Sequence, residues 1–319
     1  MLIILAIAVF LILFFKLKLM KQFLPVWVLS FVFMQNAKPC GLHNYNSIIN
    51  PFLTRKQLNI TYSYIAIQGI HYHLFDEKNS SFHTHSGLYN NEIYQTLTVD
   101  YQNPFTKMLM YHIRIPLAYN YIGNFQNPQN KYYGISDINV GMAFFKTVKK
   151  NNTVFYKKAG IDINIPAQRK WSSDVPDFTM TPSSGALGIL YYANISAFHK
   201  NLGISSDLSY KMFNTNDLGY KFANRFNFSF LTSLSTQIQH ETFLLSAGFY
   251  TELAKENQYN TVPLPNTGGW SNFLTGSVQW VNNDRYMLSC QYYHVLHEKL
   301  NGTQGKNTNR VSVTCIYLF

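Results

Sequence analysis

The feature that most constrains this chain is a series of strand-like segments that repeats almost to its end. From residue 58 onward, segments of about ten residues alternate apolar and polar side chains, which is the period of a β-strand. The first segment is 58–67 and the last is 310–319. Between them lie 91–102, 107–120, 134–147, 153–165, 186–198, 203–212, 220–236, 241–252, 272–281 and 285–297. The sequence therefore predicts about 12 strands.

The connections between these segments alternate strictly in length. The short ones are 103–107, 149–152, 199–202, the stretch near 238–241, and 282–284. The long ones are 74–90, 121–133, 166–185, 213–219, 253–271 and 298–308. Outer-membrane barrels combine tight periplasmic turns, longer external loops and an even strand number. We therefore expect an all-β fold, a single antiparallel up-and-down transmembrane β-barrel of about 12 strands over residues 58–319. The alternative, a secreted β-sandwich, requires a polar outer surface that these strands lack.

Charged residues are sorted between the two faces of the predicted strands. On the second predicted strand after the first loop, Leu109 and Ile113 share one face, whereas His112 and Arg114 fall on the other. A Lys or Arg facing lipid at mid-membrane costs about 2–4 kcal/mol, so the charged face is expected to line the lumen. Asn59 and Thr61 follow the same rule. The charged residues expected in the lumen are Asp100, Arg114, Asp137, Lys158, Asp162, Asp207 and Arg225. They form either a structural network that fills a narrow barrel or a constriction that selects solutes.

Composition excludes two other classes of protein. Only 13% of residues are charged and 16% are aromatic, whereas globular proteins average roughly 25% charged residues. After residue 35 no apolar run approaches the roughly 18 residues of a membrane helix, which excludes a polytopic helical protein. The hydrophobic content of 47% excludes a disordered chain.

Both ends of the chain indicate export to an outer membrane. Residues 1–37 predict a signal peptide, with Met20 as a possible true start, because Lys21 precedes the apolar run 23–34. One long uncleaved anchor is the alternative. Residues 38–57 would then form a short periplasmic segment. The terminal Phe319 resembles the C-terminal aromatic targeting signature of outer-membrane barrels. For an exported chain, the net charge of +11 predicts outer-membrane lipid and lipopolysaccharide as partners, and no nucleic acid.

Four histidines flank the first long loop. His71 and His73 form one H-x-H pair, and His83 and His85 form another. Imidazoles brought together across a hairpin can bind zinc, copper or nickel. The alternative is a Tyr- and His-rich rim at the membrane interface.

Several short segments resemble a family of Bacteroidota outer-membrane transporter-like barrels, which are themselves similar to the MetA-pathway phenol-degradation barrels. The matching segments are GISDINVGMAFF (134–145), AGIDINIPAQ (159–168), TGG (267–269) and NGTQ (301–304). The resemblance implies transport across the outer membrane.

Three functional hypotheses follow for a chain expected in the bacterial outer membrane. The first is a passive channel or transporter for a small solute. The second is a non-conducting barrel that anchors or scaffolds an envelope protein assembly, as in type IX secretion. The third is an outer-membrane barrel enzyme, but no nucleophile and base stand in a recognisable motif. We therefore expect neither enzymatic activity nor a cofactor.

Overall fold

The computed structural model describes most of the chain from residue 55 onward. The described residues are 55–68, 74–76, 81–83, 91–123, 128–167, 181–238, 241–264, 267–282, 285–301 and 306–319. The predicted signal peptide (1–37, including Met20) and nearly all of the predicted 38–57 segment lie outside them. No helix among the described residues is both long and apolar enough to cross a membrane.

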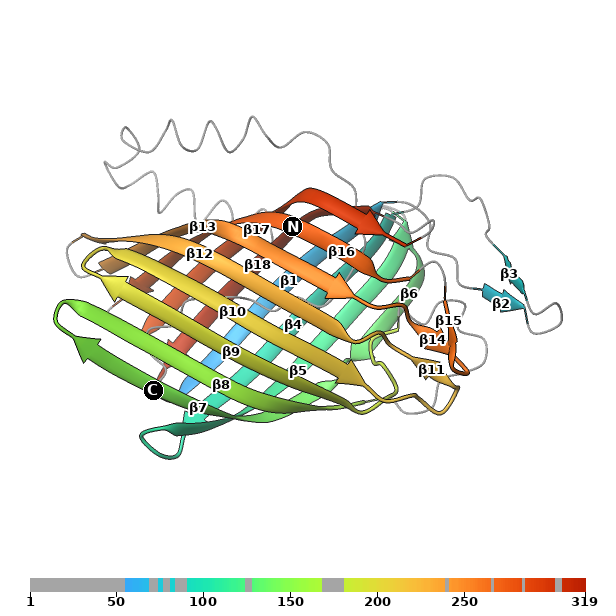
Figure 1. Ribbon diagram of the computed structural model, residues 1–319, viewed down its shortest axis with the longest axis horizontal. Coiled ribbons are helices and arrows are strands. Elements are labelled where there is room, and N and C mark those ends of the chain that lie inside the picture. The colour runs from blue at the N-terminus through green and yellow to red at the C-terminus, as the bar shows by residue number, and fades with distance from the viewer. Residues whose placement is uncertain are drawn as a thin grey trace. The chain divides into compact units, whose positions relative to one another are not determined.

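The wall of the fold is one closed antiparallel sheet, as predicted (Figure 1). Each strand pairs with its neighbours in the chain, and β1 closes the ring by pairing with both β4 and β18. The twelve wall strands are β1 (Gln57–Gln68), β4 (Asn91–Pro104), β5 (Leu109–Gly123), β7 (Ile138–Lys150), β8 (Thr153–Ile165), β9 (Gly188–His199), β10 (Leu202–Phe213), β12 (Arg225–Ile238), β13 (Glu241–Ala254), β16 (Gly269–Asn282), β17 (Tyr286–Leu300) and β18 (Lys306–Leu318).

The sheet has one break that matters for the interior. A further strand, β6 (Pro128–Ile135), pairs with the second half of β5, and β7 pairs with the first half. β6 and β7 therefore occupy one position in the wall, separated by Ser136 and Asp137. The register advances from Arg114↔Asn139 to Leu117↔Ile135, so β6–β7 holds one residue more than β5 across the break, as in a β-bulge. The prediction of a single strand over 134–147 and a loop over 121–133 is wrong at this point.

Side chains alternate across the wall as the sequence predicted. On β7 the exposed apolar residues Val140, Met142 and Phe144 face outward, while Asn139 and Ala143 are buried inside. The outer face is therefore an apolar band and the inner face is largely polar, which is the arrangement that lipid around the barrel and a polar lumen require.

The two ends of the barrel differ in their connections. One end, here called the short-turn end, carries two-residue turns at Asn151–Asn152 and Lys200–Asn201, because the strands pair up to Lys150↔Thr153 and His199↔Leu202. The first residue of each turn has a positive φ, 52° for Asn151 and 53° for Lys200. The opposite, long-loop end carries all the longer connections.

Short strands occur within the long connections. β2 (Leu74–Asp76) pairs with β3 (Ser81–His83), and β11 (Tyr220–Lys221) pairs with β14 (Gln258–Tyr259), which pairs with β15 (Val262–Pro263). The predicted strand 220–236 is therefore wrong at its start, because the wall strand begins at Arg225. The physical reason is a local turn in which the Asn216 side-chain oxygen accepts hydrogen bonds from the backbone N–H groups of Leu218 and Tyr220.

Candidate functional site in the barrel lumen

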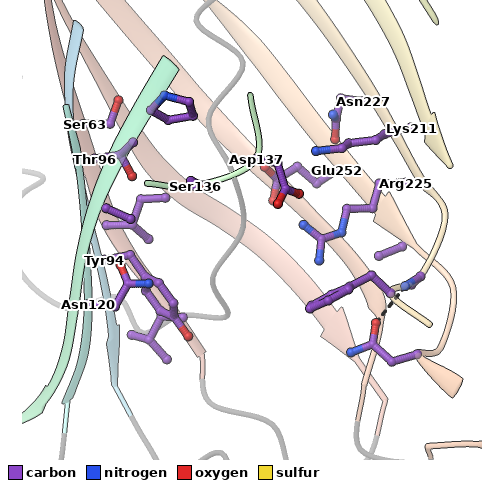
Figure 2. Close-up of a pocket in the computed structure, with 18 of the residues that line it drawn as sticks. Ser63, Tyr94, Thr96, Asn120, Ser136, Asp137, Lys211, Arg225, Asn227 and Glu252 are labelled. Carbon is purple, nitrogen blue, oxygen red and sulfur yellow. Dashed lines mark hydrogen bonds between the residues drawn. The ribbon is translucent and has the colours of Figure 1, made fainter. Parts of the chain in front are cut away.

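A cavity of about 210 Å³ lies in the lumen toward the long-loop end. β1, β4 and β5 line one side of it and β10, β12 and β13 line the other (Figure 2). Residues of the connections after β8, β10 and β13 complete the lining. The ionisable residues of the lining are Arg114, Asp137, Lys211, Arg225, Glu252 and Lys255. The cavity is therefore a polar space in which both signs of charge are present.

Asp137 is held in the break between β6 and β7 by a connection that folds against it. Its Oδ1 accepts hydrogen bonds from the Ser183 hydroxyl at 2.7 Å and the Ser184 backbone N–H at 2.8 Å. Its Oδ2 accepts a hydrogen bond from the Ser184 hydroxyl at 2.6 Å. Asn216 also donates to the Ser184 carbonyl at 3.5 Å. Hydrogen bonds to an ionised carboxylate are strong, so Asp137 fastens segment 181–187 to the wall beside the cavity.

Two basic residues face the cavity from neighbouring strands. Lys211 on β10 lies directly opposite Arg225 on β12 in the sheet register. Like charges opposite each other in a sheet are unfavourable unless other groups compensate. Figure 2 shows Asp137 and Glu252 on the same side of the cavity as this pair. The four residues therefore form one mixed-charge group, which we call the Lys211–Arg225 group.

Glu252 is held by a buried arginine on the next part of the wall. Arg310 is 0% exposed, and its Nη1 and Nη2 donate to Glu252 Oε1 and Oε2 at 2.7 and 2.9 Å. The guanidinium carbon also lies 4.2 Å from the centre of the Phe273 ring. Tyr250 donates its hydroxyl proton to Glu252 Oε1 at 2.8 Å. This bidentate geometry fixes the Glu252 carboxylate at the cavity wall.

A second set of charged residues begins at the β4 and β5 walls. Arg114 Nη2 lies 3.6 Å from Asp100 Oδ2, and the same oxygen accepts hydrogen bonds from Asn59 at 3.2 Å and Gln102 at 2.8 Å. Arg114 is the only member of this set that also lines the cavity among the described residues.

The set continues around the wall through His112 and Lys158. His112 Nε2 lies 3.0 Å from Asp162 Oδ1, and these side chains are only 2% and 0% exposed. Lys158 donates to Gln102 Oε1 at 3.5 Å, and its Nζ lies 5.6 Å from the centre of the Tyr192 ring. Each of these buried charges is therefore in contact with a polar or aromatic partner.

The seven residues predicted for the lumen fall into two groups. Arg114, Asp137 and Arg225 line the cavity. Asp100, Asp162, Lys158 and Asp207 instead make contacts along the inner wall, where Asp207 accepts hydrogen bonds from Asn194 at 2.6 Å and Ser229 at 3.0 Å. Their role in a pathway for solutes stays a prediction.

The sequence prediction missed two charged residues of the cavity, Lys211 and Glu252. Lys211 has the same parity as Asp207 within the predicted strand 203–212, so the alternation rule alone could have found it. Glu252 is the last residue of the predicted strand 241–252, where strand ends are least certain and the facing rule is weakest. The partner of Glu252 is 58 residues away, a separation that no local pattern reveals.

Apolar side chains fill other parts of the lumen. One cluster contains Met110, Ala143 and Phe145, all at most 1% exposed. A second, toward the short-turn end, is built from residues of β16, β17 and β18, with Met287 at 0% exposed. The interior is therefore packed beyond the cavity, at least around these strands.

The predicted metal site cannot be placed from the described residues. His71, His73 and His85 lie outside them, and His83 is described only as the last residue of β3. Within the described ranges there is no group of three or more His, Cys, Asp or Glu side chains that could hold a metal ion.

Comparison with known proteins places the fold. No protein-family model and no curated protein sequence matches the chain. An outer membrane channel from Pseudomonas putida F1 is similar in structure, with a TM-score of 0.60 and 9% identity, over 88% of this chain and 100% of that chain. The chain is a bacterial outer-membrane β-barrel. At this identity the similarity establishes the fold alone.

Two other solved barrels are less similar to this outer-membrane barrel. The β domain of the Bordetella autotransporter BrkA has a TM-score of 0.46 and 9% identity, over 83% of this chain and 100% of that chain. The CymD monoaromatic hydrocarbon channel has a TM-score of 0.38 and 9% identity, over 83% and 88% of the two chains. The narrower resemblance to Bacteroidota and phenol-degradation barrels stays a prediction.

Proposed function

We propose that this barrel is a passive, non-enzymatic channel for a small solute across the outer membrane. The observation that carries the proposal is the lumenal cavity, which is lined by ionisable side chains from six wall strands and opens among the residues of the long-loop end. A barrel that served only as a membrane anchor has no need for a polar cavity with charges of both signs. In a space with low-dielectric walls, such charges act strongly on a passing solute.

The Lys211–Arg225 group is the selective element of the proposed channel. Its two basic residues face the cavity, and its two carboxylates are already occupied by neighbouring donors. Asp137 accepts its three hydrogen bonds from Ser183 and Ser184, and Glu252 is bound by Arg310. The group thus offers cationic donors to a solute while the carboxylates hold them in place. Arg114, across the cavity, belongs to the same proposed pathway.

The packed clusters favour a second candidate, a barrel that anchors or scaffolds an envelope assembly without conducting. Phe145 and Met287 occupy the lumen with no more than 1% of their surface exposed. In the channel hypothesis, these side chains must leave or flank a narrow path. In the scaffold hypothesis they seal the lumen, and the long connections bind a protein partner.

Single-channel recording in a planar bilayer separates the two candidates. The purified chain, with folding verified by its altered gel mobility before heating, is compared with the double variant Lys211→Gln/Arg225→Gln. Discrete conductance that shifts toward cation selectivity in the variant is the result expected for a channel. Lys131→Gln, an exposed lysine on β6 outside the cavity lining, is the matched control and should leave selectivity unchanged. A folded barrel that never conducts contradicts the channel proposal and favours the scaffold.

A further inference from the structure

A group of lysines lies on the outer face of the barrel near the short-turn end. On β7 and β8 the outward positions continue past Phe144 and Ile161 to Lys146, Lys150 and Lys157. All three lysines are exposed. We call them the outer lysine cluster.

The strand register places two of these lysines directly opposite each other. Lys146 pairs with Lys157 across the β7–β8 ladder, and Lys150 pairs with Thr153 beside the turn. Side chains directly opposite in an antiparallel pair have Cβ atoms about 4.5–5.5 Å apart, and like charges at that distance repel. Among the described residues, no carboxylate forms an ion pair with any of the three. The protein therefore leaves this repulsion uncompensated within the part that the structure describes.

The surroundings of the cluster place it at the border of the membrane. Toward the middle of the barrel, Phe144 and Ile161 are each 43% exposed on the outer face. Ile195, which pairs with Lys157 on β9, is 56% exposed. Exposed apolar side chains at these positions belong to the band that contacts lipid tails. The ammonium groups just beyond that band lie where lipid headgroups begin, since lysine side chains extend toward the interface.

The rest of the short-turn end has the same sign of charge. Exposed basic residues there are Arg55, Lys56, Lys107, Lys149, Lys200 and Arg285. Within the described part of this end the only side-chain carboxylate is that of Glu241, which accepts a hydrogen bond from Asn282 at 3.2 Å. Each basic residue near an anionic membrane surface contributes about 1 kcal/mol of attraction, so this end favours an anionic leaflet.

We propose that the outer lysine cluster binds the phosphate of an anionic phospholipid of the phosphatidylglycerol type in the leaflet at the short-turn end. The lipid phosphate lies between Lys146 and Lys157 and receives hydrogen bonds from their ammonium groups, and Lys150 adds a third cation. The acyl chains pack on Phe144, Ile161 and Ile195. The occupant is a phospholipid, and not a free anion, because the cluster adjoins exposed apolar side chains on one side. In an outer membrane, short turns face the periplasm, so this leaflet is the inner one.

The test is native mass spectrometry of the folded full-length chain in detergent with added dioleoylphosphatidylglycerol or dioleoylphosphatidylcholine. The triple variant Lys146→Gln/Lys150→Gln/Lys157→Gln removes three charges from the cluster. We expect its apparent affinity for phosphatidylglycerol to fall by about 10-fold to 100-fold, with little change for phosphatidylcholine. Lys131→Gln/Lys299→Gln/Lys306→Gln removes three exposed charges elsewhere and should bind both lipids as the unmodified chain does.

Further arms keep the result decisive. The conservative variant Lys146→Arg/Lys150→Arg/Lys157→Arg keeps the charge and should keep the preference for phosphatidylglycerol, which separates loss of charge from damage to the fold. Equal binding of the two lipids by the unmodified chain, or equal loss in both triple glutamine variants, would overturn the proposal. Tighter binding of bisphosphorylated lipid A than of phosphatidylglycerol would also overturn it, because the site would then belong to the other leaflet. Displacement of the bound lipid by millimolar inorganic phosphate would identify a site for free anions instead.

Discussion

Two pairs of like charges occupy equivalent positions on opposite faces of the same wall. Lys211 and Arg225 are direct cross-strand partners inside the barrel, and Lys146 and Lys157 are direct cross-strand partners outside it. The inner pair has Asp137 and Glu252 on its side of the cavity. The outer pair has no ion-paired carboxylate among the described residues. The difference shows that this barrel compensates its inner charges with its own side chains and leaves the outer ones for the membrane.

The largest effect is expected where the inner compensation is itself buried. Replacing Glu252 by Ala leaves the fully buried Arg310 without its bidentate partner, and removal of one member of a buried ion pair typically costs 3–5 kcal/mol. We expect a loss of about that size in the free energy of unfolding, measured by urea titration in detergent micelles. The double variant Glu252→Ala/Arg310→Met should recover part of the loss. A change below about 1 kcal/mol would show that the pair contributes little.

The next effect concerns the tether that holds the inner group. Asp137→Ala removes the acceptor of the hydrogen bonds from Ser183 and Ser184 and leaves the Lys211–Arg225 pair with one carboxylate fewer. We expect loosening of segment 181–187, seen as faster hydrogen exchange there, together with an increase in anion over cation permeability. Asp137→Asn keeps the shape and removes the charge, so it should shift permeability with less effect on exchange. Unchanged permeability in both variants would separate Asp137 from the pathway.

A smaller and opposite effect is expected for the outer pair. Lys157→Gln relieves the repulsion with Lys146, so in zwitterionic phosphatidylcholine the barrel should gain about 0.2–1 kcal/mol in its free energy of unfolding. With phosphatidylglycerol present, the same variant also loses a lipid contact, and the gain should disappear. Unfolding by urea in vesicles of the two compositions measures the difference. The same gain in both lipids would mean that no anionic headgroup compensates the pair.

The smallest effect is the response to salt. Raising the ionic strength from 0.1 to 1 M shortens the Debye length from about 10 Å to about 3 Å, which screens exposed charges far more than buried ones. The advantage of Lys157→Gln in phosphatidylcholine should therefore shrink in 1 M salt, whereas the cost of Glu252→Ala should stay nearly the same. Equal sensitivity of both variants would show that the two faces are equally solvated.

Much of the architecture could be predicted because a barrel strand is a local pattern. The two-residue period assigns each side chain to a face, so Arg114 and Ile113 were separated without knowledge of their neighbours. Prediction was wrong where local hydrogen bonds change the path of the chain. At Asn216 a side-chain oxygen closes a turn, so the wall strand begins only at Arg225. At Asp137 the strand breaks where the wall holds an additional residue.

The sequence by itself determined the fold class, the strand number and the inward or outward direction of most charges. These follow from periodicity and from the lengths of the connections, which are properties of neighbouring residues. Only the tertiary structure decided which charges meet. Arg310 reaches Glu252 over two intervening strands, Ser184 reaches Asp137 from 47 residues away, and Lys146 lies opposite Lys157 because of the register of one hairpin. Register and ring closure depend on every strand at once, because a shift by one residue would turn each side chain to the other face.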